Sequence, residues 1–153
     1  MRGKLPLAVL ISLLTLAADQ ASKFIFNRCL EIGESVPVIK GVLHLSLVYN
    51  TGIAFGLFKN QTVFFIAVSI LAIILIILNL ILEGRGKRIH PADLWGFSLM
   101  LGGAAGNLFD RIRLGHVVDF IDLRVWPVFN LADSCITVGA IIILIRCIRS
   151  SVK

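Results

Sequence analysis

The sequence predicts an all-α integral membrane protein with four transmembrane helices and a small extracytoplasmic β element between the first and second helices. Of the 153 residues, 58% are hydrophobic. The mean hydropathy of +0.94 is too high for a chain that must surround one soluble core with polar surface. Four stretches are also long enough to cross a bilayer, which takes roughly 20 mostly apolar residues. We therefore expect a single membrane domain over residues 1–153.

The four expected spans cover about residues 5–26, 62–82, 93–113 and 129–148. The second, TVFFIAVSILAIILIILNLIL, has no charge over 21 residues, so burial in a soluble core is a poor alternative for it. The first follows MRGK and reaches Ala17-Ala18, as a cleavable signal peptide would. Because its apolar stretch continues to Phe26 and three more spans follow, we favour a retained span.

Lysines and arginines divide unevenly between the two sides of these spans. One side would hold eight of them against two acidic residues, a charge of 8 − 2 = +6, and the other seven against seven, a charge of zero. Cytoplasmic loops carry the basic excess, so the first side, with both termini, is assigned to the cytoplasm. The basic residues flank spans in short clusters, so the pI of about 9.7 needs no nucleic-acid partner.

The β element is expected on the outer side, within about residues 28–60. Its section VPVIKGVLHLSLVY is rich in β-branched residues and partly alternates, which predicts two or three short strands broken by Gly33, Pro37 and Gly41. Such strands must lie at or above the membrane interface, because an open sheet cannot cross lipid. The Asn50-Thr51-Gly52 that follows is a turn signal, and its structural and functional interpretations are equally open.

The third span contains LGGAAGNLFDR, which combines small residues with polar ones. Gly102 and Gly106 have GxxxG spacing, which favours close helix packing in a membrane. Asn107 and Arg111 share one helix face, and Asp110 lies three residues after Asn107. Polar groups at that depth cost too much to leave unpaired, so we expect each of them to have a partner.

Two carboxylates gather at the outer edge of the last two spans. Asp119 follows the third span, Asp133 lies about one turn inside the fourth, just after Asn130, and the loop between them is short enough to let them meet. Two carboxylates a few Å apart cannot both ionise cheaply, so one keeps its proton. Such a pair supplies an acid and a base for peptide hydrolysis, without a metal or a covalent intermediate. Asp122 is the weakest candidate, because pairing with Arg124 explains it.

Asp19 and Lys23 form an i, i+4 pair near the outer end of the first span. If exposed, such a pair would stabilise the helix by only ~0.3 to 0.5 kcal/mol. Its place at the membrane edge suits either of two roles, anchoring the outer strands or organising the acidic site. We favour the structural role.

Five motifs, AADQASK, NTGIAFG, GGAAGNLFDR, GHVVDFID and FNLADS, in this order, resemble those of the lipoprotein signal peptidases, also called signal peptidase II. The resemblance covers nearly the whole chain. The family's catalytic aspartates lie in its VVDF and FNxAD motifs, which implies that Asp119 and Asp133 are catalytic and Asp122 is a bystander. Asp110 is expected to support Arg111 and the local fold. The family's other recurrent polar positions, which support the site or contact substrate, correspond here to Asp19, Lys23, Asn50, Asn107, Asp110, Arg111 and Asn130.

The resemblance implies an intramembrane aspartic endopeptidase of the bacterial inner (plasma) membrane, with its active site near the outer leaflet. The family cleaves diacylglyceryl-modified prolipoproteins on the N-terminal side of the lipidated cysteine, and is sensitive to the cyclic peptide globomycin. We accordingly expect prolipoprotein substrates, membrane lipids and globomycin-type inhibitors as partners, and no nucleic acid. We expect no cofactor and no metal, and a monomer suffices to complete the site.

Two other classes of protein fit parts of the sequence. A small transporter or channel would use Asp19, Asp110 and Asp133 to relay protons or bind cations. Its acids should then lie near the midplane on broken helices, often in repeated halves, whereas here they gather at one edge. A noncatalytic scaffold would explain the GxxxG face and leave the clustered acids unexplained.

Overall fold

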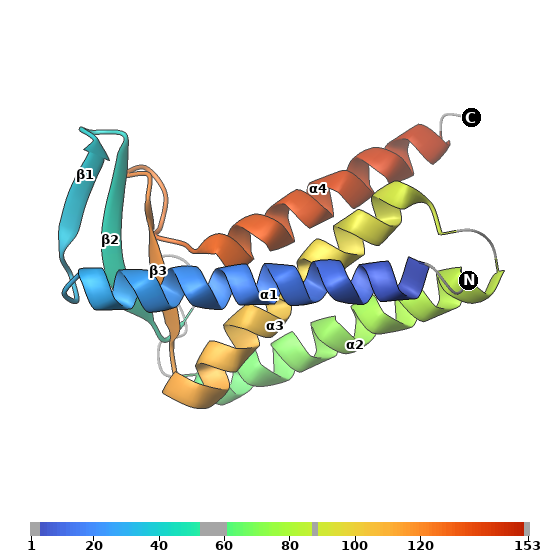
Figure 1. The fold of residues 1–153 in the computed structure, drawn as a ribbon, viewed down its shortest axis with the longest axis horizontal. Coiled ribbons are helices and arrows are strands. Elements are labelled where there is room, and N and C mark those ends of the chain that lie inside the picture. Colours follow the sequence, from blue (N-terminus) through green and yellow to red (C-terminus); the bar gives the residue numbers. More distant parts are fainter. Residues whose placement is uncertain (1–3, 53–60, 87–88, 152–153) are drawn as a thin grey trace.

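The structure, a computed structural model, describes residues 4–52, 61–86 and 89–151. Its elements, in chain order, are α1 (Lys4–Cys29), β1 (Ser35–Ile39), β2 (Leu43–Asn50), α2 (Thr62–Gly86), α3 (Pro91–Leu114), β3 (Val117–Asp122) and α4 (Leu131–Ser151). The strands form a small sheet at one end of the helices, and the chain begins and ends at the opposite end (Figure 1). The prediction of a mostly helical chain with a small β element is thus confirmed.

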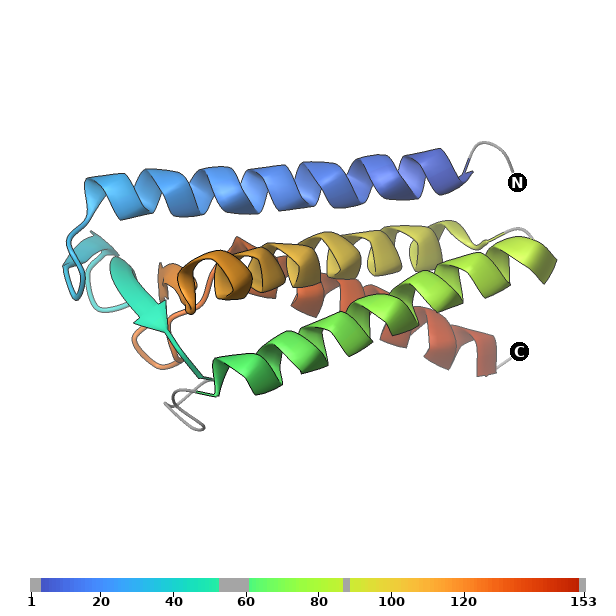
Figure 2. The ribbon, with the colours of Figure 1, turned by 90° about the horizontal axis from the view of Figure 1, so that it is seen from below.

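Three helices in the described part of the chain are long and apolar enough to cross a membrane: α1, the Thr62–Leu82 part of α2, and α4. Helix α3 is not among them; it carries Asp93 near its start and Asp110, Arg111 and Arg113 near its end. It packs against α1, α2 and α4, and Figure 2 shows it running between α1 and α2. Asp93 and Asp110 are accordingly buried against protein.

The glycines of α3 let other helices approach closely. A Cβ on Gly102 would lie 2.6 Å from the backbone oxygen of Ser12 and from the Cβ of Thr15, and a Cβ on Gly106 would collide with the carboxylate of Asp19. Any side chain there would push α1 away. The predicted packing role of the GxxxG glycines is confirmed, and Gly106 in addition gives a buried carboxylate its space.

The sheet has the order β1-β2-β3, with both pairs antiparallel. Strands β1 and β2 lie in the region where the sequence predicted strands, and residues 53–60 of that region lie outside the described residues. The third strand was not predicted: β3 comes from the connection between α3 and α4, so Asp119 lies in a strand and not in a loop. Strand β3 lacks the alternation of buried and exposed residues that identifies a strand with one face in solvent, because five of its six residues are buried.

Two glycines turn the chain beside the strands, at Gly33 with φ 83° and Gly41 with φ 78°, as predicted. Pro37 does not break the strand, contrary to the prediction. It lies within β1, an edge strand, next to an irregularity in the pairing between Pro37 and Ile39. An edge strand tolerates proline there because the missing N–H is not needed by a second neighbour.

Helix α4 begins at Leu131, two residues later than the predicted start at 129. Phe129 is instead held in an antiparallel bridge to Ile121. Asn130 then caps the helix: its Oδ1 accepts a hydrogen bond from the backbone N–H of Asp133 at 3.0 Å, while the Asp133 Oδ2 accepts one from the backbone N–H of Asn130 at 3.3 Å. This reciprocal arrangement is a capping box, and it fixes the first turn that carries Asp133.

Candidate active site

Strand β3 presents Asp119 to a pocket that opens at the sheet end of the helices. Val117 and Asp119 are two residues apart and so project from the same face of the strand, and both line the pocket. At the end of neighbouring β2, the Asn50 Nδ2 donates to the Asp119 Oδ2 at 2.9 Å. The Asn50 Oδ1 accepts from the Gly52 N–H at 3.0 Å. The turn thus orients an amide that contacts the carboxylate, and the functional interpretation of this segment stays a prediction.

Asn130 links the two carboxylates. Its Nδ2 donates to the Asp119 Oδ1 at 2.7 Å, while its Oδ1 and its backbone N–H form the capping box with Asp133. The side chain is fully buried, so it is held in this position. One asparagine thus fixes Asp119 on β3 relative to Asp133 on α4.

Asp119 and Asp133 both line a pocket of about 220 Å³. The expectation that these two residues, 14 positions apart in the sequence, come together at one site is met. Asp119 is only 2% exposed, whereas Asp133 is partly exposed. The remaining wall residues are Asn50, Gly52, Asn107, Arg111, Val117, Trp126, Pro127, Val128 and Phe129.

The pKa of Asp119 is raised to about 7, principally by burial. The hydrogen bond from Asn50 opposes this rise, the negative charge of Asp133 adds to it, and the hydrogen bond from Asn130 and the charge of Lys23 oppose it. Burial and a nearby like charge both disfavour the anion. Asp119 is therefore poised to hold a proton near neutral pH.

Behind the pocket, Lys23 lies at the centre of a buried polar network. Its Nζ lies 2.9 Å from both the Asp19 Oδ2 and the Asp110 Oδ2, and donates to the Asn107 Oδ1 at 2.9 Å. The Asn107 Nδ2 in turn donates to the Asp133 Oδ1 at 2.8 Å. The Asp19–Lys23 pair therefore connects through one amide to a candidate catalytic carboxylate, beyond the structural role that we favoured.

The two acids of this network also position the elements of the site. The Asp19 Oδ1 accepts from the backbone N–H of Ala132 in the first turn of α4 at 2.9 Å. The Asp110 Oδ2 accepts from the backbone N–H of Val118 in β3 at 3.2 Å. Asp110 was expected to support Arg111 and the local fold. It holds Lys23 and the strand that carries Asp119, and its charge also acts on Arg111.

The sequence interpretation assigned no role to Gln20, which completes this network. Its Nε2 lies 3.1 Å from the Asp19 Oδ2, 3.0 Å from the Asp110 Oδ1 and 3.3 Å from the Gly106 carbonyl oxygen. The available signal was an uncharged amide in the apolar first span, next to an acid. Its partners on α3 are about 90 positions away in the sequence, beyond the reach of local patterns.

Arg111 brings a positive charge to the pocket wall. Its Nη1 donates to the backbone oxygen of Asn107 at 3.4 Å, and its guanidinium lies 5.5 Å from the ring centre of Phe65 on α2. Its positive charge interacts most strongly with the Asp133 carboxylate and next most strongly with the Asp119 carboxylate. The one cation on the described wall thus acts on both carboxylates from inside the pocket.

Asp122 lies outside the residues that line this pocket. Its Oδ2 accepts from the Ser46 hydroxyl at 2.9 Å and pairs with the Arg124 Nη1 at 3.2 Å, so the predicted pairing with Arg124 is confirmed. Desolvation raises the pKa of Asp122, but the hydrogen bonds from the Arg124 backbone and Ser46 outweigh it and hold this pKa below its usual value. Asp122 therefore stays an anion that braces the sheet.

Comparison with known proteins identifies a family. Residues 11–149 match the family described as signal peptidase (SPase) II. The chain is 47% identical to the lipoprotein signal peptidase of Moorella thermoacetica over 88% of both chains, and 41% identical to that of Brevibacillus brevis over 89% of this chain and 91% of the relative. Two solved bacterial membrane enzymes superpose on it. The first has a TM-score of 0.86 and 31% sequence identity, and the match covers 95% of this chain and 90% of that enzyme. The second has a TM-score of 0.82 and 32% identity, and the match covers 93% of this chain and 92% of that enzyme. The chain, a membrane protein by its apolar helices and these likenesses, belongs to the signal peptidase II family.

Proposed function

We propose that the chain is an intramembrane aspartic endopeptidase that removes the signal peptide from diacylglyceryl-modified prolipoproteins, cutting on the N-terminal side of the lipidated cysteine. Family membership supports prolipoprotein processing and disfavours the transporter and scaffold interpretations. The observation that carries the catalytic proposal is the pair Asp119 and Asp133, which line one pocket and are joined through Asn130.

In the proposed mechanism, the two carboxylates share one proton at neutral pH. Because burial raises the pKa of Asp119 to about 7, we assign the proton to Asp119, which makes it the general acid. Asp133 is partly exposed, and accepts hydrogen bonds from the Asn107 amide and the Asn130 backbone. With the shared proton on Asp119, Asp133 is the member of the pair that is left to accept one. This makes Asp133 the general base.

The reaction needs only these two groups and one water. Asp133 takes a proton from the water while the water oxygen attacks the scissile carbonyl carbon. At the same time Asp119 gives its proton to the carbonyl oxygen. Asp133 then returns its proton to the leaving nitrogen as the C–N bond breaks, and Asp119 recovers a proton from the hydroxyl group. The products are a signal peptide with a new carboxylate and a lipoprotein with a free cysteine amino group.

We place α3 as the fourth membrane span and residues 1–153 in one membrane domain. The 24 residues of α3 extend about 36 Å, enough to cross the ~30 Å hydrocarbon core. Its charged residues are tolerable because Asp93 and Asp110 are buried in protein contacts, with Arg146 and Lys23 as their partners. Length and internal pairing thus compensate for a composition that is less apolar than that of the other helices.

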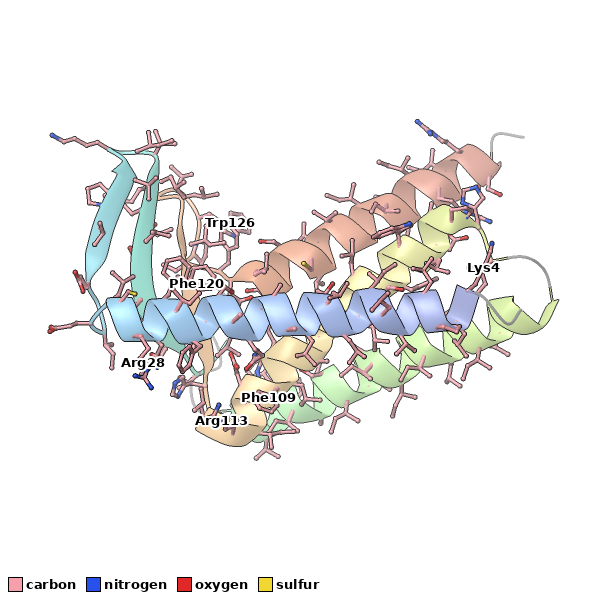
Figure 3. The ribbon with its side chains drawn as sticks, viewed as in Figure 1. Lys4, Arg28, Phe109, Arg113, Phe120 and Trp126 are labelled. Carbon is pink, nitrogen blue, oxygen red and sulfur yellow. The ribbon has the colours of Figure 1, made fainter. Side chains whose placement is uncertain are left out.

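We place the pocket at the outer leaflet and both termini in the cytoplasm. Both ends of the chain lie opposite the sheet (Figure 1), at the end that holds the basic excess, as the positive-inside rule requires. The two tryptophans, Trp95 near the start of α3 and Trp126 beside the sheet, are 50% and 59% exposed. Tryptophan concentrates at both membrane interfaces, and Figure 3 shows Trp126 between the sheet and α4.

This placement suits a lipidated substrate. Trp126, Pro127, Val128 and Phe129 give one side of the pocket an apolar wall, so the segment around the scissile bond is shielded from water while the diacylglyceryl chains remain in the bilayer. The described pocket is built from one chain, so a monomer suffices. A globomycin-type cyclic peptide is expected to compete for the same pocket.

The test is cleavage of a purified diacylglyceryl-modified prolipoprotein by the wild type, Asp119→Asn and Asp133→Asn, with Asp122→Asn as the matched control. Loss of general acid or base catalysis predicts a rate reduction of roughly 10²- to 10⁴-fold for the first two. Asp122→Asn should remain within about threefold of wild type, since Asp122 lies outside the pocket and its partners are Ser46 and Arg124. Thermal unfolding in detergent verifies that every variant is folded.

Mass spectrometry of both products locates the cleaved bond. The new N-terminal residue should be the lipidated cysteine, and the precursor without its diacylglyceryl group should be a much poorer substrate. A folded Asp119→Asn or Asp133→Asn variant with near wild-type turnover would show that the substituted residue is not catalytic. Loss of activity on adding a chelator would contradict the two-aspartate mechanism.

A further inference from the structure

A second pocket lies at the opposite end of the molecule from the two aspartates. It has a volume of about 750 Å³ and lies between the start of α3 and the last turns of α4. We call it the inner pocket, and the lining residues that matter here are His90, Ala92, Ile142, Ile145, Arg146 and Arg149. None of them lines the pocket that holds Asp119 and Asp133.

The α4 side of the inner pocket changes from apolar to basic toward the helix end. Ile142, Ile145, Arg146 and Arg149 follow i, i+3, i+4, i+7 spacing, so they share one helix face. At 1.5 Å per residue, Ile142 and Arg149 are about 10 Å apart along the axis. This gradient matches a phospholipid that lies parallel to the helix, with a chain on the isoleucines and its headgroup at the arginines.

The basic end of the pocket keeps cationic character despite one acid beside it. Asp93 is 3% exposed, and its Oδ2 lies 3.0 Å from the Arg146 Nε, so this acid is neutralised by Arg146. Arg149 is exposed, and has no ion pair among the residues that the structure describes. The carboxylate thus fixes one arginine and leaves the other for an anion.

The α3 side of the inner pocket adds polar groups that also favour an anion. The His90 Nδ1 accepts a hydrogen bond from the Ala92 N–H at 3.2 Å, so the proton of a neutral ring is on Nε2, which can donate. His90 and Ala92 also form the N-terminus of a 24-residue helix, whose dipole favours an anion. An arginine, a histidine donor and a helix N-terminus therefore surround one end of an otherwise apolar pocket.

We propose that the inner pocket binds an anionic phospholipid of the cytoplasmic leaflet, with the phosphate at Arg149 and His90 and an acyl chain along Ile142 and Ile145. The assignment to that leaflet rests on the proposed topology. Basic pockets between transmembrane helices on the cytoplasmic side bind anionic headgroups in this way. The exposed Trp95, less than two turns into α3, places the pocket at the level of the membrane interface.

The experiment measures lipid retention by the purified full chain in detergent, using native mass spectrometry with phosphatidylglycerol or phosphatidylcholine. Arg149→Gln tests the pocket, and Arg113→Gln is the matched control, an exposed arginine at the far end of α3. One arginine near an anionic surface is worth ~1 kcal/mol, which is about fivefold in affinity. We expect phosphatidylglycerol to bind the wild type in preference to phosphatidylcholine, with that preference reduced about fivefold by Arg149→Gln and unchanged by Arg113→Gln.

A double variant, Asp93→Asn with Arg146→Gln, tests the same pocket while removing both members of the buried pair, so no charge is stranded. It should keep its preference for phosphatidylglycerol, because Arg149 and His90 remain and the removed pair carries no net charge. Equal retention of the two lipids by the wild type, or an unchanged preference in Arg149→Gln, would overturn the proposal. Displacement of the lipid by free glycerol phosphate at equal concentration would show a site for soluble phosphate instead. Because lipid retention requires no proteolysis, these outcomes are independent of whether the chain cleaves prolipoproteins.

Discussion

The side-chain amide of Asn107 donates a hydrogen bond of 2.8 Å to the Asp133 carboxylate. The direction of this bond is set from the other side, because the Asn107 Oδ1 accepts from Lys23 at 2.9 Å. A lysine ammonium can only donate, so the amide oxygen must face Lys23 and the nitrogen must face Asp133. Lys23 therefore makes Asn107 a donor to the carboxylate of the proposed general base.

Asn107→Ala should reduce kcat more than it changes KM, because it removes a hydrogen bond to the proposed base. Hydrogen bonds to charged groups contribute ~1.5–3 kcal/mol, which corresponds to a roughly 10- to 150-fold loss of kcat. The measurement is steady-state cleavage of the lipid-modified precursor. Asn79→Ala is the control, since Asn79 is exposed on α2 and, within the described residues, its side chain donates to the Leu75 carbonyl of its own helix. An unchanged kcat in folded Asn107→Ala would rule out the positioning role.

Lys23→Met should strongly destabilise the protein. Lys23 is 3% exposed and lies between Asp19 and Asp110, so its loss leaves two buried acids without their cation. Breaking a buried ion pair from one side costs ~3–5 kcal/mol. Thermal unfolding in detergent should show a large decrease in Tm, whereas Arg28→Met, an exposed cation of the same helix, should show little change.

A further variant tests whether Lys23 stabilises the fold through its charge. Adding Asp19→Asn and Asp110→Asn to the Lys23→Met variant removes the stranded charges, and much of the lost Tm should return. A triple variant no more stable than Lys23→Met alone would mean that Lys23 stabilises the fold by packing and not by charge. Activity is not the readout here, because Asn107 loses its orientation in both backgrounds.

The pH dependence of cleavage should show a decline above about pH 7. The pKa of Asp119 is raised to about 7, so above that pH the pair loses its shared proton and, with it, the general acid. The two carboxylates titrate as a unit, so the decline reports the pair. The measurement is kcat/KM from pH 5 to pH 9, and a flat profile between pH 7 and pH 9 would contradict the assignment.

The same pKa predicts a pH dependence of stability. The ordinary aspartate pKa of 3.8 is raised to about 7 for Asp119 in the folded state, so between these values the folded chain binds more protons than the unfolded one. Stability from Asp119 is then fully present below about pH 4 and is lost as the pH rises to about 7. The Tm advantage of Asp119→Asn over wild type should therefore be larger at pH 8 than at pH 4. Equal differences at both pH values would contradict the raised pKa.

Those parts of the fold that have a strong local signal were predictable from sequence. An uncharged run such as Thr62–Leu82 has few alternatives to a membrane helix, and β1 and β2 follow from β-branched alternation beside turn glycines. Strand β3 was not predicted because it is buried on both faces. On one face the ring of Phe120 stacks on that of Phe26, with the ring centres 4.3 Å apart, and the other face lies against the pocket. A six-residue segment with acids at two positions does not look like a strand until its partner is known.

The gathering of the candidate site residues at one edge was predictable from sequence, but the contacts that connect them were not. The acids at the membrane edge marked Asp119 and Asp133, because charge at that depth is costly without a purpose. What the sequence could not predict was that Asp110 holds Lys23 and β3, or that Gln20 joins them, since these contacts bring α1 to α3 from about 90 positions away. Long-range pairing depends on helix approach, which local patterns do not encode.

Gly106→Ala should show that helix approach controls the site. The added methyl would collide with the Asp19 carboxylate, which must move and break its contacts with Lys23 and the Ala132 N–H. Overpacking of this kind costs ~1–3 kcal/mol, and it acts on the helix start that carries Asp133. We therefore expect a lower Tm together with a reduced kcat, whereas the exposed Ala140 of α4 should accept Ala140→Val with neither change. A Gly106→Ala variant with wild-type Tm and wild-type kcat would mean that α1 and α3 can separate without disturbing the aspartates, and that the close approach serves packing alone.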